Sequence, residues 1–145
     1  MNILLLEEET LAFEGLSLKV YVCPAGELTV GVGHRVLPTD NLKHGDRISL
    51  KQAGEFLHND LSIAIRDAQE LFGRAFFDSL SEKRQHALID LLFNLGKTRF
   101  SKFVRTIDAI KKHDWKRAHD ELLDSKYATQ VGRRAKRNAL CLLEG

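Results

Sequence analysis

The sequence predicts an α+β fold in which a small β-hairpin or sheet lobe and a helical lobe are joined by a long helix. Period-two alternation of apolar residues is confined to one short stretch, residues 15–33, whereas helical spacing prevails elsewhere. One amphipathic stretch, residues 49–72, would form a helix roughly 35 Å long, enough to join two lobes with a cleft between them. A chain of 145 residues is one domain by size, or two small lobes sharing a long element.

The first elements are a short helix and a hairpin. Apolar and acidic residues up to Glu14 predict the helix, and alternation at residues 18–22 predicts a strand after it. Residues 23–27, Cys-Pro-Ala-Gly-Glu, have turn chemistry, and alternation resumes over residues 28–33. The stretch therefore predicts a helix end, a strand, a turn and a second strand. A carboxylate at the helix end, facing the open edge of the hairpin, makes a concave site.

A loop and the long helix come next. Residues 35–47 contain turn-forming proline, asparagine and glycine, which predicts a loop with room for a short third strand. Ser49 and Gln52 fit a capping box at the start of the long helix, and Gly73 ends it.

The remaining chain predicts the helical lobe. Residues 82–95 form a strongly apolar helix that Gly96 stops, and its composition places it at the centre of this lobe. Shorter helices are expected near residues 101–112, 114–125 and 133–143, with Asp114 as the N-cap of the second. We therefore assign residues 15–48 to the β-containing lobe, 1–14 and 73–145 to the helical lobe, and 49–72 to the connecting helix.

Charge and targeting signals narrow the function classes. The net charge of +2 hides an asymmetry, because residues 97–145 carry 13 Lys and Arg against 6 Asp and Glu. Such a basic segment is explained either by binding to an anionic partner or by lysines and arginines that simply face solvent on helices. We favour the explanation by solvent-facing residues. Nucleic-acid binding is disfavoured, since no stacking platform of aromatic residues accompanies the basic ones. No apolar run reaches the ~20 residues of a membrane span, and the N-terminus lacks a secretory pattern, so we expect cytoplasmic synthesis and free thiols at Cys23 and Cys141.

The hairpin carries a family resemblance. Glu14, then eight residues, Cys23, then five residues and Thr29, followed by Gly31, Gly33 and His34, resembles the catalytic signature of phage-type lysozymes. These are the endolysins of glycoside hydrolase family 24, and most of them have aspartate where this chain, like a cysteine-containing branch, has Cys23. The likeness covers essentially the whole chain and continues at Ile48-Ser49, Asp60, Ala87-Leu88-Ile89, Phe93-Asn94-Leu95-Gly96, Trp115 and Arg134-Ala135-Lys136-Arg137.

The resemblance implies a lysozyme-like fold and a catalytic set of Glu14, Cys23 and Thr29. The activity it implies is hydrolysis of the β-1,4 bond between N-acetylmuramic acid and N-acetylglucosamine in peptidoglycan, with inversion. Glu14 would protonate the departing oxygen, and the Thr29 hydroxyl would help hold the attacking water on the opposite face. Cys23 remains open between a thiolate, a weak water-holder and a spectator, since a thiol of pKa near ~8.5 is mostly neutral at pH 7.

Supporting and substrate-contacting residues also follow from the resemblance. His34 and Asp60 would form a structural ion pair, and Arg134 would contact the catalytic glutamate. Without the resemblance, Arg134 would be interpreted as part of a solvated basic helix face and Phe93 as a core residue. The six histidines show no clustered metal-ligand spacing, so we expect neither a metal nor a cofactor. The candidates for substrate contacts are Gly31, Gly33, Arg35, Phe93, Asn94, Thr106, Lys126, Tyr127 and Gln130.

The expected partners are peptidoglycan and a membrane-permeabilising holin. The chain would act as a monomer, remaining in the host cytoplasm until the membrane opens and then reaching the periplasm and cell wall for host lysis. One alternative is a lytic transglycosylase, which needs no water-holding carboxylate; Thr29 argues against it. Another is a non-catalytic wall-binding homologue, which the presence of both Glu14 and Thr29 disfavours.

Overall fold

The computed structural model describes all 145 residues and confirms the α+β class, with nine α-helices and one small antiparallel sheet. The chain divides into two compact units, residues 2–62 and residues 63–145, the second taking in Met1 as well. The boundary falls within the long helix α2 (Leu50–Phe72). The N-terminal helix belongs to the compact unit that holds the sheet. We expected this helix in the helical lobe, and that lobe assignment stays a prediction.

Helix α1 (Ile3–Glu14) opens the first unit and places Glu14 at its last position. The Asn2 side chain caps its start by accepting the Leu5 N–H at 3.0 Å. Gly15 ends it with φ 69° and donates its N–H to the Leu11 carbonyl at 2.8 Å. The predicted helix end at Glu14 is confirmed.

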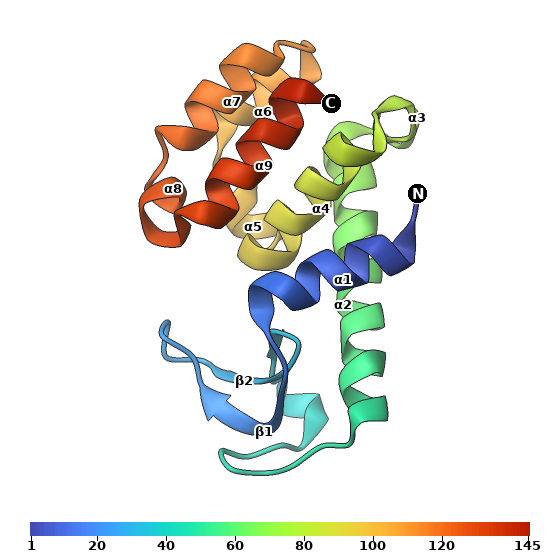
Figure 1. The fold of residues 1–145 in the computed structure, drawn as a ribbon, viewed down its shortest axis with the longest axis vertical. Helices are drawn as coiled ribbons and strands as arrows, with labels where there is room; N and C mark the ends of the chain where they lie inside the picture. The colour runs from blue at the N-terminus through green and yellow to red at the C-terminus, as the bar shows by residue number, and fades with distance from the viewer. The chain divides into compact units, whose positions relative to one another are not determined.

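The sheet has three antiparallel strands in the order β1-β2-β3, of which Figure 1 labels the first two. They are β1 (Ser17–Val22), β2 (Leu28–Gly31) and β3 (His34–Arg35). The prediction that the second strand runs to residue 33 is wrong. Gly31 and Gly33 adopt φ of 67° and 65°, which turns the chain between them, so that His34 begins the third strand.

The two faces of the sheet differ in character. Val20 and Val30 pack with Ile48 and Ala53 in an apolar core that lies between the sheet and the start of α2. On the other face, Tyr21 pairs with Thr29, and Thr29 pairs with Arg35, across all three strands. Directly paired residues share a face of an antiparallel sheet, so these three side chains form one row.

The loop after β3 leads into α2. It contains a 3₁₀ turn (Pro38–Asp40) and a single bridge between Lys19 and Arg47. The predicted capping box is confirmed: the Ser49 N–H donates to the Gln52 side chain at 2.9 Å, and the Gln52 N–H donates to the Ser49 hydroxyl at 3.1 Å. Helix α2 ends at Phe72, directly before Gly73 as predicted.

The second unit is entirely helical. Helix α4 (Glu82–Leu95) has the predicted bounds and is its most buried helix, and α9 (Arg133–Glu144) lies beside α4 and α7 (Figure 1). Three short helices were not predicted, α3 (Arg74–Ser79), α5 (Lys97–Phe100) and α8 (Lys126–Val131). The others are α6 (Val104–Lys111) and α7 (Trp115–Leu123). None of the helices combines the length and the apolar character needed to cross a membrane.

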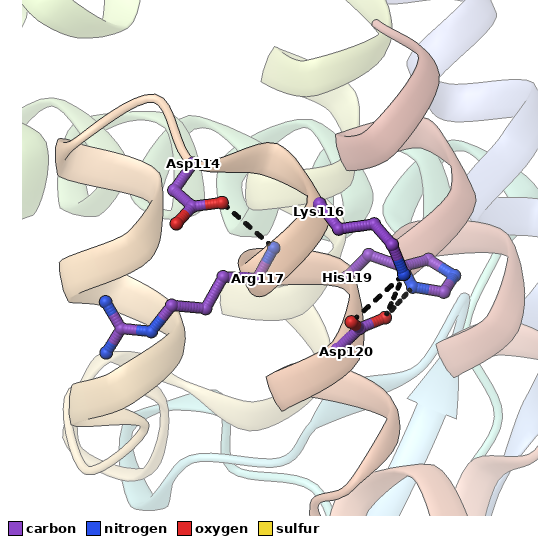
Figure 2. Close-up of polar contacts among 5 residues, drawn as sticks. All are labelled: Asp114, Lys116, Arg117, His119 and Asp120. Carbon is purple, nitrogen blue, oxygen red and sulfur yellow. Dashed lines mark hydrogen bonds and ion pairs between the residues drawn. The ribbon is translucent and has the colours of Figure 1, made fainter.

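Two interactions lie at the start of α7 and at the end of α9. The Asp114 side chain accepts the Arg117 N–H at 3.2 Å, which confirms it as the N-cap of α7 (Figure 2). The Arg84 guanidinium lies 3.9 Å from the centre of the Trp115 ring and donates from Nε to the Leu142 carbonyl at 2.8 Å. One arginine therefore joins α4, α7 and the C-terminal turn of α9 by stacking and hydrogen bonding.

Candidate active site

The carboxylate of Glu14 lies directly against the backbone of Gly33. A Cβ atom added at Gly33 would be 2.6 Å from Oε2 of Glu14 and 2.7 Å from its Cδ. Real Cβ atoms do not approach that closely, so a side chain at position 33 would require the Glu14 carboxylate to move. The predicted sugar contact of Gly33 stays a prediction.

Gly31 has a different neighbour. A Cβ there would lie 3.5 Å from both Cα and Cβ of Ala53, in the packed region between the sheet and α2. Gly31 is itself buried, so its missing side chain faces the interior of the unit. Its predicted sugar contact stays a prediction.

Thr29 lies on the central strand with only 5% of its surface exposed. Its hydroxyl donates to the carbonyl oxygen of Glu27 at 3.1 Å. A hydroxyl has one proton and two lone pairs, so in this arrangement Thr29 keeps acceptor capacity. A water molecule that donates a hydrogen bond to the Thr29 hydroxyl would be oriented by this contact.

Cys23 is a free thiol at the start of the hairpin turn, and the chain's other cysteine, Cys141, is not in a disulfide either. The backbone N–H of Glu27 is the main cause that lowers the pKa of the Cys23 thiol, against an opposing contribution from burial. Hydrogen bonds from Thr29 and from the Ala25 N–H lower it further, whereas the Glu27 carboxylate raises it. More thiolate is therefore present at neutral pH than in an ordinary cysteine. Because Thr29 has one proton, its hydroxyl donates either to Glu27 or to the sulfur.

Tyr21 belongs to this group of side chains and was missed by the sequence analysis. Burial is the main cause that raises the pKa of its phenol, followed by the negative charges at Glu14 and Cys23. Tyr21 therefore remains a neutral hydrogen-bond donor near both residues. Strand alternation carries the signal that finds it, since residue 21 lies on the opposite face of β1 from the buried Val20.

His34 forms the predicted ion pair and a second one that was not predicted. Its Nδ1 lies 2.7 Å from Asp60 Oδ2, and its Nε2 lies 2.9 Å from Asp40 Oδ2. The ring also stacks on Phe56, with centroids 4.0 Å apart, and only 5% of the residue is exposed. His34 thus ties β3 to both the 3₁₀ turn and α2.

These contacts shift pKa values in opposite directions. Burial lowers the pKa of His34, but hydrogen bonds and charges at Asp60 and Asp40 outweigh it, and the net shift is upward. Burial raises the pKa of Asp40, but the Leu37 N–H and His34 outweigh it, and the net shift is downward. The contribution of His34 to stability is present below its unfolded pKa of ~6.5 and is lost as pH rises through its folded value. That of Asp40 is present above ~3.9 and is lost as pH falls through its folded value.

We therefore expect His34→Asn to destabilise the protein more at pH 5.5 than at pH 9. At pH 5.5 the variant should lose about 1.5–3 kcal/mol, the scale of hydrogen bonds to charged groups. Urea unfolding at both pH values measures the difference. His44→Asn, at an exposed loop histidine, is the matched control and should change little at either pH. Equal losses for His34→Asn at the two pH values would contradict the protonated ion pairs.

Arg134 lies in the second unit as part of a buried polar network. Its Nε and Nη2 donate to Asp90 at 2.9 Å and 2.8 Å, and the Asn138 amide donates to the same carboxylate at 2.7 Å. All three residues are buried, with 7%, 2% and 0% of Arg134, Asp90 and Asn138 exposed. The interpretation of Arg134 as a solvated basic face is thus wrong. Its expected contact with Glu14 would join the two units and stays a prediction.

Three of the expected substrate contacts share a cavity. Thr106, Lys126 and Tyr127 line a hollow of about 430 Å³ within the second unit. Phe93 and Asn94, near the end of α4, and Gln130, on α8, are not among its lining residues. Binding of substrate to any of these six residues stays a prediction.

Arg35 is the remaining expected contact. It forms an ion pair with Glu27, with Nε 2.9 Å from Oε2, at an exposed position next to Thr29. The structure shows no group of three or more His, Cys, Asp or Glu side chains arranged to hold a metal ion. The side chains of Glu14, Thr29, Cys23 and Tyr21 offer this site a carboxylic acid, a hydroxyl, a thiol and a phenol.

Comparison with known proteins places the site residues in a family context. A family model described as Phage lysozyme matches residues 11–139, a range that includes Glu14, Cys23 and Thr29. The chain is 30% identical over 151 residues to the pre-baseplate central spike protein Gp5 of Enterobacteria phage T4, covering 91% of this chain and 26% of that protein. It is 37% identical over 89 residues to an endolysin of Acyrthosiphon pisum secondary endosymbiont phage 1, covering 61% and 56%. It is 25% identical over 144 residues to a probable T4-type lysozyme 2 of Dictyostelium discoideum, covering 86% and 85%.

The chain corresponds to only part of two of these relatives. The chain spans about a quarter of the spike protein and just over half of the phage endolysin. The assignment to a branch with cysteine at position 23 stays a prediction.

Proposed function

The chain belongs to the phage lysozyme family, and on that premise we propose that it is a lysozyme-type hydrolase of bacterial cell-wall peptidoglycan. The observation that carries the proposal is the arrangement of Glu14, Cys23 and Thr29 within one compact unit. Glu14 ends α1 against Gly33, Thr29 lies in the row with Tyr21 and Arg35, and Cys23 begins the hairpin turn between β1 and β2. The proposed bond is the β-1,4 link between N-acetylmuramic acid and N-acetylglucosamine, and the proposed outcome is inversion.

In the proposed mechanism, Glu14 donates a proton to the departing glycosidic oxygen. Thr29 orients the attacking water through a lone pair, because its own proton is used toward the Glu27 carbonyl or the Cys23 sulfur. Cys23 assists on the water side without forming a covalent bond to the sugar. Tyr21 remains protonated nearby and supplies a hydrogen-bond donor to the same polar face.

A lytic transglycosylase acting on the same bond is the second candidate. The observation that favours it is Cys23, since a transglycosylase needs no carboxylate to hold water. The acceptor capacity of the Thr29 hydroxyl favours hydrolysis instead.

One experiment tests the function and separates the candidates. Purified protein is added to chloroform-permeabilised Gram-negative cells, the loss of turbidity is followed, and the released muropeptides are analysed by mass spectrometry. We expect lysis with reducing ends; 1,6-anhydro ends would indicate the transglycosylase, and wall binding without release a non-catalytic homologue. On the likeness to an endolysin, we propose a holin as the partner that lets the protein reach the wall.

Substitutions at Cys23 should rank Asp, Ser and Ala in order of decreasing activity. Cys23→Asp should equal or exceed the wild type if negative charge stabilises the transition state, Cys23→Ser should be partly active, and Cys23→Ala clearly impaired. If the thiolate is the active form, wild-type lysis should rise with pH below the ordinary thiol value of ~8.5, because the pKa of Cys23 is lowered. Lysis rates across a pH series check this ranking.

Cys141→Ala, at the chain's other cysteine, is the matched control and should leave the lysis rate unchanged. A fully active Cys23→Ala variant would mean that Glu14 and Thr29 suffice. Cys23 would then have no part in catalysis.

A further inference from the structure

We propose that Glu27 and Arg35 are positioning residues, and that their ion pair holds Cys23 and Thr29 in the geometry needed to orient the attacking water. The catalytic part of this inference rests on the proposed function. The geometric part concerns the hairpin alone.

The backbone of Glu27 contacts both residues. Its carbonyl oxygen accepts the Cys23 N–H at 2.9 Å and the Thr29 hydroxyl at 3.1 Å. Its own N–H is directed to the Cys23 sulfur and is the main cause that lowers the pKa of that thiol. A displacement of the peptide groups of residue 27 would therefore disturb the thiol and the hydroxyl together.

The side chain of Glu27 connects this position to another strand. Glu27 lies directly before β2, and its carboxylate pairs with Arg35 on β3 at 2.9 Å. Arg35 is also the cross-strand partner of Thr29. The ion pair thus spans from the end of the turn to the third strand, past Thr29.

The exposure of the pair decides what kind of role it can have. Both side chains are 48% exposed, and ion pairs of this kind contribute little to global stability. Their loss should therefore leave the midpoint of unfolding nearly unchanged. The pair can still have a local role, which is to hold residue 27 in place at the end of the turn. That turn is closed by a hydrogen bond of 2.8 Å from the Gly26 N–H to the Cys23 carbonyl.

Electrostatics alone would give a different result from positioning. The charged and titratable groups near the Cys23 sulfur are the Glu27 carboxylate, the phenol of Tyr21 and, through Tyr21, Glu14. If only charge mattered, removing Glu27 would lower the pKa of the thiol and removing Arg35 would raise it. If the pair positions the backbone, both removals weaken the contact between the Glu27 N–H and the sulfur. Both removals then raise the pKa of the Cys23 thiol, because this contact has a larger effect on that pKa than the Glu27 charge has.

The test compares Glu27→Ala, Arg35→Ala and the double variant in a Cys141→Ser background, where Cys23 is the only thiol. The pKa of Cys23 is measured from the rate of iodoacetamide alkylation as a function of pH. The values of kcat and KM are measured on purified peptidoglycan. Lys116→Ala is the matched control, because it removes an exposed ion pair to Asp120 on α7, in the other unit (Figure 2).

We expect both single variants to raise the pKa of Cys23 by about half a pH unit and to lower kcat about fivefold at similar KM. The double variant should be no worse than either single one, because residues that act as a unit are not additive. Lys116→Ala should change neither quantity.

Three outcomes would overturn the proposal. Shifts of the thiol pKa in opposite directions in the two single variants would mean that the pair acts only through its charges. No shift in either variant would mean that the pair does not influence the thiol. A raised KM in Arg35→Ala alone, with Glu27→Ala unchanged, would make Arg35 a plain substrate contact. If the wild type hydrolyses no peptidoglycan, the proposed function fails, while the alkylation measurements still decide the positioning of Cys23.

Discussion

Glu14→Gln should reduce the rate of cell-wall lysis by about 10²–10⁴-fold, the usual contribution of a positioned general acid. The amide keeps the size and shape of the side chain but has no proton of suitable acidity to give to the departing oxygen. Since Gln also fits beside Gly33, the fold should survive, and the far-UV circular dichroism and unfolding midpoint should match those of the wild type.

The matched control is Glu8→Gln, which makes the same chemical change at an exposed position of α1. It should lyse permeabilised cells at the wild-type rate. Lysis by Glu14→Gln at a similar rate would contradict the entire mechanism, because Glu14 is the only proton donor to the departing oxygen in it.

The largest effect on stability should come from Asp90→Ala, with an expected loss of about 3–5 kcal/mol. The substitution removes the carboxylate that accepts two hydrogen bonds from the buried Arg134 and one from the buried Asn138. A guanidinium that stays in the interior without this carboxylate is costly, because its charge is no longer balanced there. Urea unfolding at fixed pH measures the loss.

Asp78→Ala provides the comparison for an exposed pair. Asp78 pairs with Arg74 at 3.9 Å, with 57% of its side chain exposed, so its loss should lie within about 1 kcal/mol of zero. Asp90→Asn should fall between the two, since it keeps the shape and loses the charge. A loss below about 1 kcal/mol for Asp90→Ala would mean that the network contributes specificity or positioning and little stability.

Local sequence signals determined several helix ends of this protein. The Ser49 and Gln52 pair, the cap at Asp114 and the Gly96 N–H to Leu92 join residues three or four positions apart, and α2 ends directly before Gly73 as predicted. The apolar period over α4 was likewise sufficient, since a long buried helix repeats its pattern several times. Helices of four to six residues, α3, α5 and α8, complete too few turns to show a period.

The third strand shows where the pattern misleads. Alternation continues through residue 33, yet the chain turns between Gly31 and Gly33. Alternation reports which side chains are apolar, whereas the turn requires positive φ at two glycines. The backbone conformation that these glycines adopt is a property of the folded unit.

The sequence by itself determined the spacing of Glu14, Cys23 and Thr29, and with it the family. Tertiary structure alone decided the groups around them: Tyr21 and Arg35 in one row with Thr29, Asp40 as a second partner of His34, and Asp90 as the counterion of Arg134. Arg134 and Asp90 are 44 positions apart, and the row crosses three strands. Contacts of this kind depend on strand register and helix packing, and these are settled only when the apolar faces are buried together.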